Sequence, residues 1–201
     1  MKDKIIGRGA EAILIQQGKH LVKDRIKKDY RHPELDIFLR KSRTRHEAKI
    51  LGKASKIISV PAVFGKSDFK INMEFIRGKR LSDWLDKMNE KEAMKVCGLI
   101  GQEVGKLHNS GIIHGDLTTS NMILKDKKVY LIDFGLGFHS VRLEDKAVDV
   151  HLLKEALKSK HFKRWANYFK EVIKNYSAKD CDAVLKQLEK VESRGRYKGQ
   201  I

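Results

Sequence analysis

The sequence has few cysteines and no long apolar run, and both absences limit what the protein can be. Its 2 cysteines, Cys97 and Cys181, form no C-x-x-C pair, which excludes a disulfide framework or a zinc site of that spacing. Each falls on an apolar helical stripe, so we expect buried thiols in a reducing compartment. No apolar run approaches the ~18 residues that a membrane span requires, and no signal sequence is recognisable. We therefore expect a cytoplasmic protein without membrane contact.

Acidic residues are also scarce relative to basic ones. The chain has 43 Lys and Arg against 26 Asp and Glu, a net charge of +17 over 201 residues. Such an excess predicts a polyanionic partner, nucleic acid first and an acidic protein or membrane surface second, although a lysine-rich thermophile surface is an alternative. Residues 19–56 alone carry 13 basic and 5 acidic residues. The candidate contacts in this patch are Arg25, Lys27, Lys28 and Arg31.

The segment from His114 to Gly135 carries the clearest chemistry. It reads H-G-D-L-T-T-S-N, then a hairpin pattern over roughly 122–132, then D-F-G. Asp116 would orient the attacking hydroxyl, while Asn121 and Asp133 would offer the hard oxygen ligands that Mg²⁺ prefers. Phosphoryl transfer from ATP needs this combination of charge neutralisation and positioning. Polar turn chemistry is the alternative, but both halves in order resemble the catalytic and metal loops of the kinase superfamily.

Residues 4–24 predict three short strands, and in a kinase-like plan the first turn would lie over the ATP phosphates. Lys23, on the third strand, is the candidate for contacting the phosphates. Ala12 stands where a glycine-rich loop has its third glycine, so a plain hairpin turn fits equally well. A carboxylate at this turn would repel a triphosphate unless a cation intervenes. The candidate nucleotide contacts at the turn are Gly7, Gly9, Ala10 and Glu11.

Two helix signals follow. Pro33 could begin a short helix, and Thr44-x-x-Glu47 is a capping-box pattern that predicts a helix beginning at Thr44. A kinase-like plan also needs a helix glutamate to pair with Lys23. One residue cannot easily do both, and we favour Glu47 as the partner of Lys23.

Two further strands, 62–65 and 69–75, lead to a flexible link at Ile76–Lys79 that matches a hinge between lobes. The backbone of Glu74, Phe75 and Ile76 would bind adenine, with Met73 behind the ring, although methionine is more often core filler. Helices are then predicted at 81–88, from Asn89 to Ser110, and at about 145–158, 161–175 and 178–192. We predict an α+β, minimal bilobal kinase-like fold with lobes at 1–76 and 77–192 and a basic tail at 193–201.

Over nearly its full length the chain resembles the PRPK-type small atypical kinases of the KEOPS complex. The resemblance is carried by Gly9–Ala12, Lys23, Tyr30–Asp36, Arg43-Thr44, Glu47-Ala48, the two loop motifs and Arg194–Tyr197. It implies a Ser/Thr-type kinase that acts mainly as an ATPase, uses ATP and Mg²⁺, and works with the tRNA threonylcarbamoyl-adenosine synthase subunit, other KEOPS subunits and tRNA. It also implies partner or tRNA contacts at Arg194, Arg196, Tyr197 and Lys198, for which a solvated terminus is the alternative.

The carboxyl-terminal half departs from a regulated protein kinase. Gly115 replaces the arginine before the catalytic aspartate, no Ala-Pro-Glu element follows, and Asp149 comes soon after Asp133. We therefore expect constitutive, slow turnover without a peptide-binding platform. Two other functions stay open: a RIO-type or small-molecule kinase, and a non-catalytic tRNA-binding assembly factor with a kinase shape.

Overall fold

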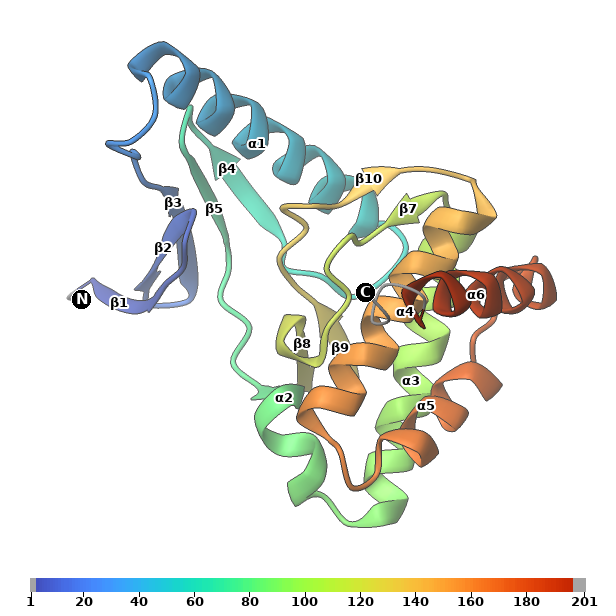
Figure 1. Ribbon diagram of the computed structural model, residues 1–201. Coiled ribbons are helices and arrows are strands. Elements are labelled where there is room, and N and C mark those ends of the chain that lie inside the picture. The colour runs from blue at the N-terminus through green and yellow to red at the C-terminus, as the bar shows by residue number, and fades with distance from the viewer. Residues whose placement is uncertain (1–2, 197–201) are drawn as a thin grey trace.

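The computed structural model describes residues 3–196, and the amino-terminal lobe is built on a five-stranded antiparallel sheet (Figure 1). The strands follow the order β1-β2-β3-β5-β4. They are β1 Lys4–Arg8, β2 Ala12–Gln17, β3 His20–Arg25, β4 Val63–Lys66 and β5 Lys70–Glu74. The antiparallel register sets Lys23 opposite Leu14 on one side and Ile71 on the other. The central strand of the sheet therefore carries the predicted phosphate lysine.

One long helix, α1 (Pro33–Ala54), lies beside this sheet. The predicted helix start at Thr44 is wrong: Thr44 and Glu47 lie inside α1, and both are buried. Proline occupies the first turn, where its fixed φ suits a helix, and Glu34 and Asp36 in that turn complement the helix dipole. These signals begin the helix eleven residues earlier, and the apparent capping box is a coincidence of spacing.

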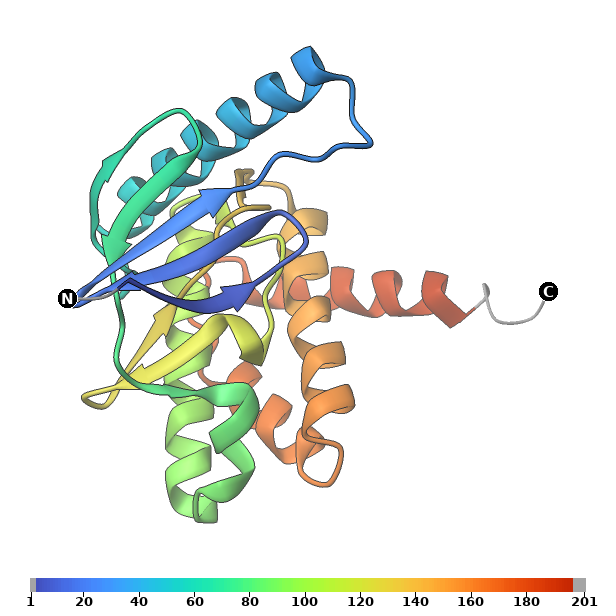
Figure 2. The same cartoon turned by 90° about the vertical axis from the view of Figure 1, so that its left-hand side faces the viewer.

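The carboxyl-terminal lobe is mainly helical (Figures 1 and 2). Its helices are α2 Leu81–Trp84, a 3-10 turn at Leu85–Lys87, α3 Glu90–Asn109, α4 Leu143–Lys160, α5 Trp165–Lys174 and α6 Cys181–Arg196. Short strands complete it: β6 Lys79–Arg80, β8 Met122–Lys125 and β9 Lys128–Leu131 form one sheet, and β7 Ile112–Ile113 pairs with β10 Phe138–His139. This division confirms the predicted α+β fold.

Helix α3 is the centre of that lobe. Asn89 caps it by accepting the Glu92 N–H at 2.9 Å, as its sequence predicts. Its apolar face is fully buried, and Cys97 lies within that face as expected, whereas Cys181 is only partly buried. Gly101 lets α5 approach closely, because a Cβ there would lie 2.2 Å from the Val172 carbonyl oxygen. Glycine therefore sets the distance between these two helices.

Helix α6 packs on α4 and buries Val184 and Leu188, while its carboxyl-terminal end extends beyond the body of the lobe (Figure 2) and continues to Arg196. The backbone is therefore helical where the predicted basic tail was expected to begin. The lobe boundary at residue 76 stays a prediction. Among residues 3–196, no helix is both apolar enough and long enough to traverse a bilayer.

Candidate active site

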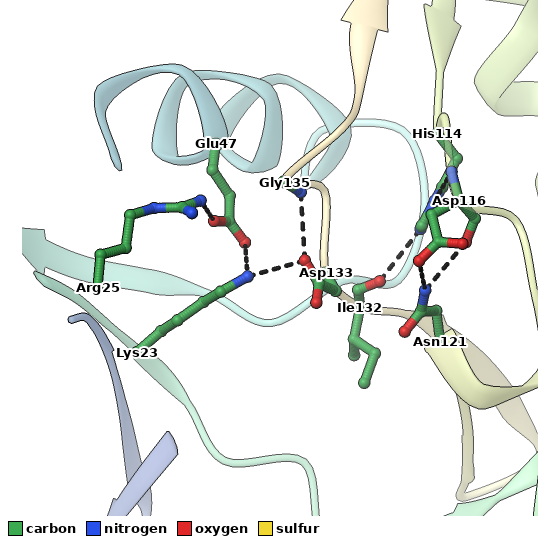
Figure 3. A network of polar contacts seen from close by, with 9 residues as sticks. All are labelled: Lys23, Arg25, Glu47, His114, Asp116, Asn121, Ile132, Asp133 and Gly135. Atoms are coloured by element: carbon green, nitrogen blue, oxygen red, sulfur yellow. Dashed lines mark hydrogen bonds and ion pairs between the residues drawn. The ribbon is translucent and has the colours of Figure 1, made fainter. Parts of the chain in front are cut away.

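A buried ion network joins the two lobes (Figure 3). Lys23 Nζ on β3 donates to Glu47 Oε1 on α1 at 2.7 Å, so the structure brings the two predicted partners together. The second carboxylate oxygen of Glu47 accepts from Arg25, two positions along the same strand, at 2.5 Å. Because strand residues two apart share a face, β3 presents both cations to one helix carboxylate. Glu47 is only 1% exposed, so this carboxylate depends on its two cations.

Asp133 ties this network to the carboxyl-terminal lobe. Its Oδ1 accepts from Lys23 Nζ at 2.8 Å and from the Gly135 N–H at 3.3 Å. Burial raises the pKa of Asp133, but the ammonium of Lys23 and these hydrogen bonds outweigh it and hold the pKa below its ordinary value. The residue is therefore an ionised carboxylate at neutral pH. Its φ of 61° is left-handed, a conformation that aspartate tolerates better than most residues.

The catalytic loop presents the other two predicted residues. Asn121 Nδ2 donates to the backbone oxygen of Asp116 at 2.9 Å and to its Oδ2 at 2.8 Å. This double contact fixes the Asp116 side chain and turns the Asn121 amide oxygen away from it. His114 Nε2 donates to the Ile132 carbonyl at 3.1 Å, one residue before Asp133. The catalytic and metal loops are thus bonded directly to each other.

Asp149 is a site residue whose role sequence reasoning missed. This fully buried carboxylate on α4 accepts the main-chain N–H groups of His114 at 2.8 Å and Gly115 at 2.9 Å. It also contacts His108 Nε2 at 3.1 Å, and His108 Nδ1 contacts the Tyr176 hydroxyl at 2.6 Å. Asp149 therefore anchors the backbone of the catalytic loop. An acidic residue with apolar neighbours on both sides, Val148 and Val150, is the sequence signal that could have revealed it.

Two adjoining cavities lie between the lobes at this network. The larger, about 430 Å³, is lined by Lys23, Asp116 and Asp133, among others. The smaller, about 140 Å³, is mostly apolar and includes Met73 and Ile76 from the predicted hinge. The two share Leu14, Lys23 and Asp133. A flat apolar group at one end and a polyanion at the other fit this pair of cavities.

Two of the three main-chain N–H groups in the predicted hinge are already bonded within the protein. The Glu74 N–H donates to the Ala62 carbonyl at 2.8 Å, and the Phe75 N–H donates to Lys19 at 2.9 Å. Within the described residues, the Ile76 N–H is the member of the predicted trio without such a bond. Of these three N–H groups, the Ile76 N–H is therefore the one left for an adenine ring, and binding of adenine by the hinge backbone stays a prediction.

The donor set where the two cavities adjoin fits Mg²⁺: Asn121 lines the smaller cavity and Asp133 lines both. The Asn121 amide oxygen and the half-exposed Asp133 carboxylate are hard oxygen ligands. Among residues 3–196 there is no cluster of three or more His, Cys, Asp or Glu residues suited to holding a metal. A site with so few protein ligands matches Mg²⁺, which is usually held by one or two carboxylates together with substrate phosphates and water.

Comparisons with known proteins agree with this geometry. Residues 2–152 match the protein kinase domain family. KEOPS complex subunit Bud32 of Pyrococcus abyssi is 44% identical over 97% of this chain and 96% of the relative. The chain belongs to the Bud32 family of protein-kinase-like proteins. The predicted kinase-like fold and the KEOPS resemblance are thereby confirmed.

Other relatives are longer. Proteins described as probable bifunctional tRNA threonylcarbamoyladenosine biosynthesis proteins match 96% of the chain at 37% identity in Methanosarcina mazei, and 98% at 41% in Methanobrevibacter smithii. The chain spans only 36% and 37% of their lengths. A solved structure, the streptomycin-ATP-APH(2")-IIa ternary complex, covers 93% of this chain and 81% of its own at 16% identity with a TM-score of 0.63, which shows a common fold alone.

In this Bud32-family chain, the carboxylate at the predicted phosphate turn is paired with two cations from outside the turn, Arg31 in the loop before α1 and Arg43 on α1. Glu11 accepts from Arg31 at 2.9 Å and from Arg43 at 2.6 Å. Burial raises the pKa of Glu11, but the two guanidinium groups outweigh it and hold the pKa below its ordinary value. Gly9 closes the turn by donating to Ala12 at 2.9 Å, and Gly9, Ala10 and Glu11 all line the larger cavity. Gly7 lies in β1, outside that lining.

The predicted basic patch needs correction. Arg25 is buried against Glu47, and the Arg31 side chain is only 13% exposed and paired with Glu11, so neither is a surface contact for nucleic acid. Lys27 is exposed, whereas Lys28 is partly buried. Two of the four candidate contacts, Arg25 on β3 and Arg31 in the loop before α1, are therefore paired inside the protein. A count of charges along the sequence cannot detect such pairing.

The predicted tail contacts are only partly visible. Arg194 is exposed and donates to Glu144 at 2.6 Å. Arg196 is the last residue of α6, and its side chain lies outside the described part of the chain. Tyr197 and Lys198 lie outside the described residues altogether. A partner or tRNA contact at this end stays a prediction.

Proposed function

We propose that this chain binds Mg²⁺–ATP between its lobes and transfers the terminal phosphoryl group, acting in the cytoplasm as the kinase-type ATPase of a KEOPS-like complex. The observation that carries the proposal is the bridge from Lys23 to both Glu47 and Asp133, at 2.7 and 2.8 Å. That bridge holds together, across the two lobes, the groups that must meet a triphosphate simultaneously. Bound Mg²⁺ would neutralise charge on the phosphates as the bond to the leaving group breaks.

Each residue then has a distinct task. Lys23 binds the inner phosphates, and Glu47 keeps its ammonium in position. Asn121 and Asp133 hold the metal through their free oxygens. Asp116, fixed by the Asn121 amide, orients the attacking hydroxyl or water and accepts its proton. The adenine ring lies in the apolar cavity near Met73.

Catalysis is tested by ADP release from the purified chain. We expect Asp133→Ala and Asp116→Ala to abolish turnover, with Asp116→Ala retaining nucleotide affinity because its task is to orient the attacking group. Asp182→Ala, an exposed carboxylate on α6, is the matched control and should leave turnover unchanged. Equal rates in wild type and Asp133→Ala would contradict the enzyme and leave a non-catalytic assembly factor.

The setting follows from the relatives. The printed names of the longer relatives concern tRNA threonylcarbamoyladenosine biosynthesis, and the Pyrococcus relative is named as a KEOPS subunit. We infer that this chain works with a tRNA threonylcarbamoyl synthase partner, other KEOPS subunits and tRNA, and that its carboxyl-terminal end from Arg194 contacts a partner. The +17 charge supports work beside an RNA.

Two measurements test the partner contact and the tRNA contact separately. Removing residues 194–201 should lower partner-dependent turnover and leave the affinity for Mg²⁺–ATP intact. If the deletion instead abolishes ATP binding, this segment supports the nucleotide site of its own chain rather than a partner contact. Binding of tRNA should weaken steeply with salt. A change of less than about one log unit in affinity per log unit of salt would mean that few phosphates are contacted.

A further inference from the structure

Three cations line the larger cavity, and one of them differs from the other two. Lys23 and Arg25 are nearly buried, and both donate to Glu47. Arg43 is 41% exposed, donates one hydrogen bond, to Glu11, and makes no other within the described residues. Since a guanidinium carries five N–H donors, most of those on Arg43 stay available to a ligand.

Arg43 is placed to contact the last phosphate of a bound nucleotide rather than the phosphates nearest the base. Lys23 and Asp133 line both cavities, whereas Arg43 and Asp116 line only the larger one. A nucleotide with its base in the apolar cavity reaches Lys23 first. Its last phosphate extends beyond Lys23 to the region of Asp116 and Arg43. A diphosphate would end near Lys23 and leave Arg43 without a contact.

Glu11 and Arg31 hold Arg43 in place. The Arg31 side chain is only 13% exposed and its guanidinium also lies 3.8 Å from Asp36, so it is fixed behind the turn. It donates to one oxygen of Glu11, and Arg43 donates to the other. Two cations on one carboxylate leave a surplus positive charge beside the cavity. The carboxylate at the phosphate turn therefore no longer repels an anion.

We propose that Arg43 is a binding subsite for the terminal phosphate of a nucleoside triphosphate, and that Glu11, held by Arg31, is its positioning residue. The proposal rests on the proposed function. Ala12 replaces the third glycine of a phosphate loop, and Glu11 occupies the turn, so the main-chain cradle is incomplete. A guanidinium fork from α1 supplies what the turn lacks, since its planar geometry matches a phosphate.

The experiment compares two nucleotides on the full chain by calorimetry: Mg²⁺–ADP and a non-hydrolysable ATP analogue with a nitrogen bridge. For Arg43→Gln we expect the triphosphate affinity to fall about tenfold or more and the ADP affinity to change less than about twofold. Arg43→Lys should restore part of the loss. Arg45→Gln, an exposed arginine on the same helix, is the matched control and should change neither. Thermal unfolding verifies that each variant is folded.

Other outcomes would overturn the subsite. Equal losses for both nucleotides would give Arg43 a general structural role, and no loss would remove it from the site. Glu11→Gln should also weaken the triphosphate, by less than Arg43→Gln. A rise in triphosphate affinity would instead show that Glu11 competes with phosphate for Arg43. If the wild-type chain binds neither nucleotide, the proposed function itself is refuted. This outcome distinguishes failure of the proposed function from failure of the Arg43 subsite alone.

Discussion

Glu47→Gln is the substitution that tests most directly whether the buried network holds the lobes together. It keeps the size of the side chain and removes one charge. The four-residue network of Lys23, Arg25, position 47 and Asp133 therefore changes from a net charge of zero to +1. At an effective dielectric constant of 20, a charge pair at 2.7 Å is worth about 6 kcal/mol before desolvation, which offsets much of it. Removing one partner of a buried pair typically costs about 3–5 kcal/mol.

A loss of that size is a large share of the roughly 5–15 kcal/mol that stabilises a typical domain. Urea unfolding followed by circular dichroism would measure it. Glu155→Gln is the matched control, because Glu155 pairs with Lys158 on one exposed helix face and its loss should cost less than about 0.5 kcal/mol.

A double variant tests whether the cost of Glu47→Gln comes from the unbalanced buried charge. Arg25→Met combined with Glu47→Gln restores a balanced set, so the double variant should be less destabilised than the sum of the two, by about 0.5–3 kcal/mol. Strict additivity, or a cost for Glu47→Gln no larger than for Glu155→Gln, would refute the view that Glu47 depends on two buried cations.

Three further predictions use the same unfolding measurement. Gly101→Ala should cost at least about 2 kcal/mol, because its Cβ would lie 2.2 Å from the Val172 carbonyl oxygen. Gly52→Ala, on α1 with no atom within 4 Å of its Cβ, should stabilise by about 0.5–1 kcal/mol; equal effects at the two glycines would contradict the close packing of α3 and α5. Asp149→Asn should cost about 2–4 kcal/mol, since an amide cannot accept from all of its buried donors, and a neutral result would remove it as the anchor of the catalytic loop. The folded pKa of Asp133 lies below its unfolded value, so its contribution should be constant from pH 5 to 8 and be lost below about pH 4; loss near pH 6 in a comparison with Asp133→Asn would contradict this.

The sequence predicts well which candidate site residues come together, because phosphoryl-transfer chemistry would fix both their types and their spacing. The structure brings Lys23, Glu47 and Asp133 into direct contact, and it bonds Asp116 to Asn121. Their roles toward nucleotide and metal stay predictions. What the sequence could not show is which charges face each other, since pairing depends on how the loop before α1 folds back.

The errors have a common physical cause. A capping box and a helix interior can share the pattern Thr-x-x-Glu, and only tertiary burial of Thr44 and Glu47 distinguishes them. Arg25 contributes to a basic count as much as Lys27 does, although one is buried against a carboxylate and the other is exposed. Local sequence patterns identify the charged residues of the site. The oppositely charged residues that pair with them lie on elements distant in the sequence, so local patterns do not identify the pairs.

Gly115 stands where a regulated protein kinase has an arginine, and the backbone is tightly packed at this position. Its φ is +77°, and a Cβ there would lie 2.3 Å from the Leu136 carbonyl oxygen, so the loop after Asp133 packs where a side chain would stand. His46 on α1 then donates to the Gly137 carbonyl in that same loop at 2.5 Å. Because glycine packing and a helix contact already hold the loop against both lobes, no phosphorylated residue is needed to order it. We therefore predict constitutive nucleotide turnover, with the choice of substrate left to partners; turnover that rises after phosphorylation of this loop would contradict the prediction.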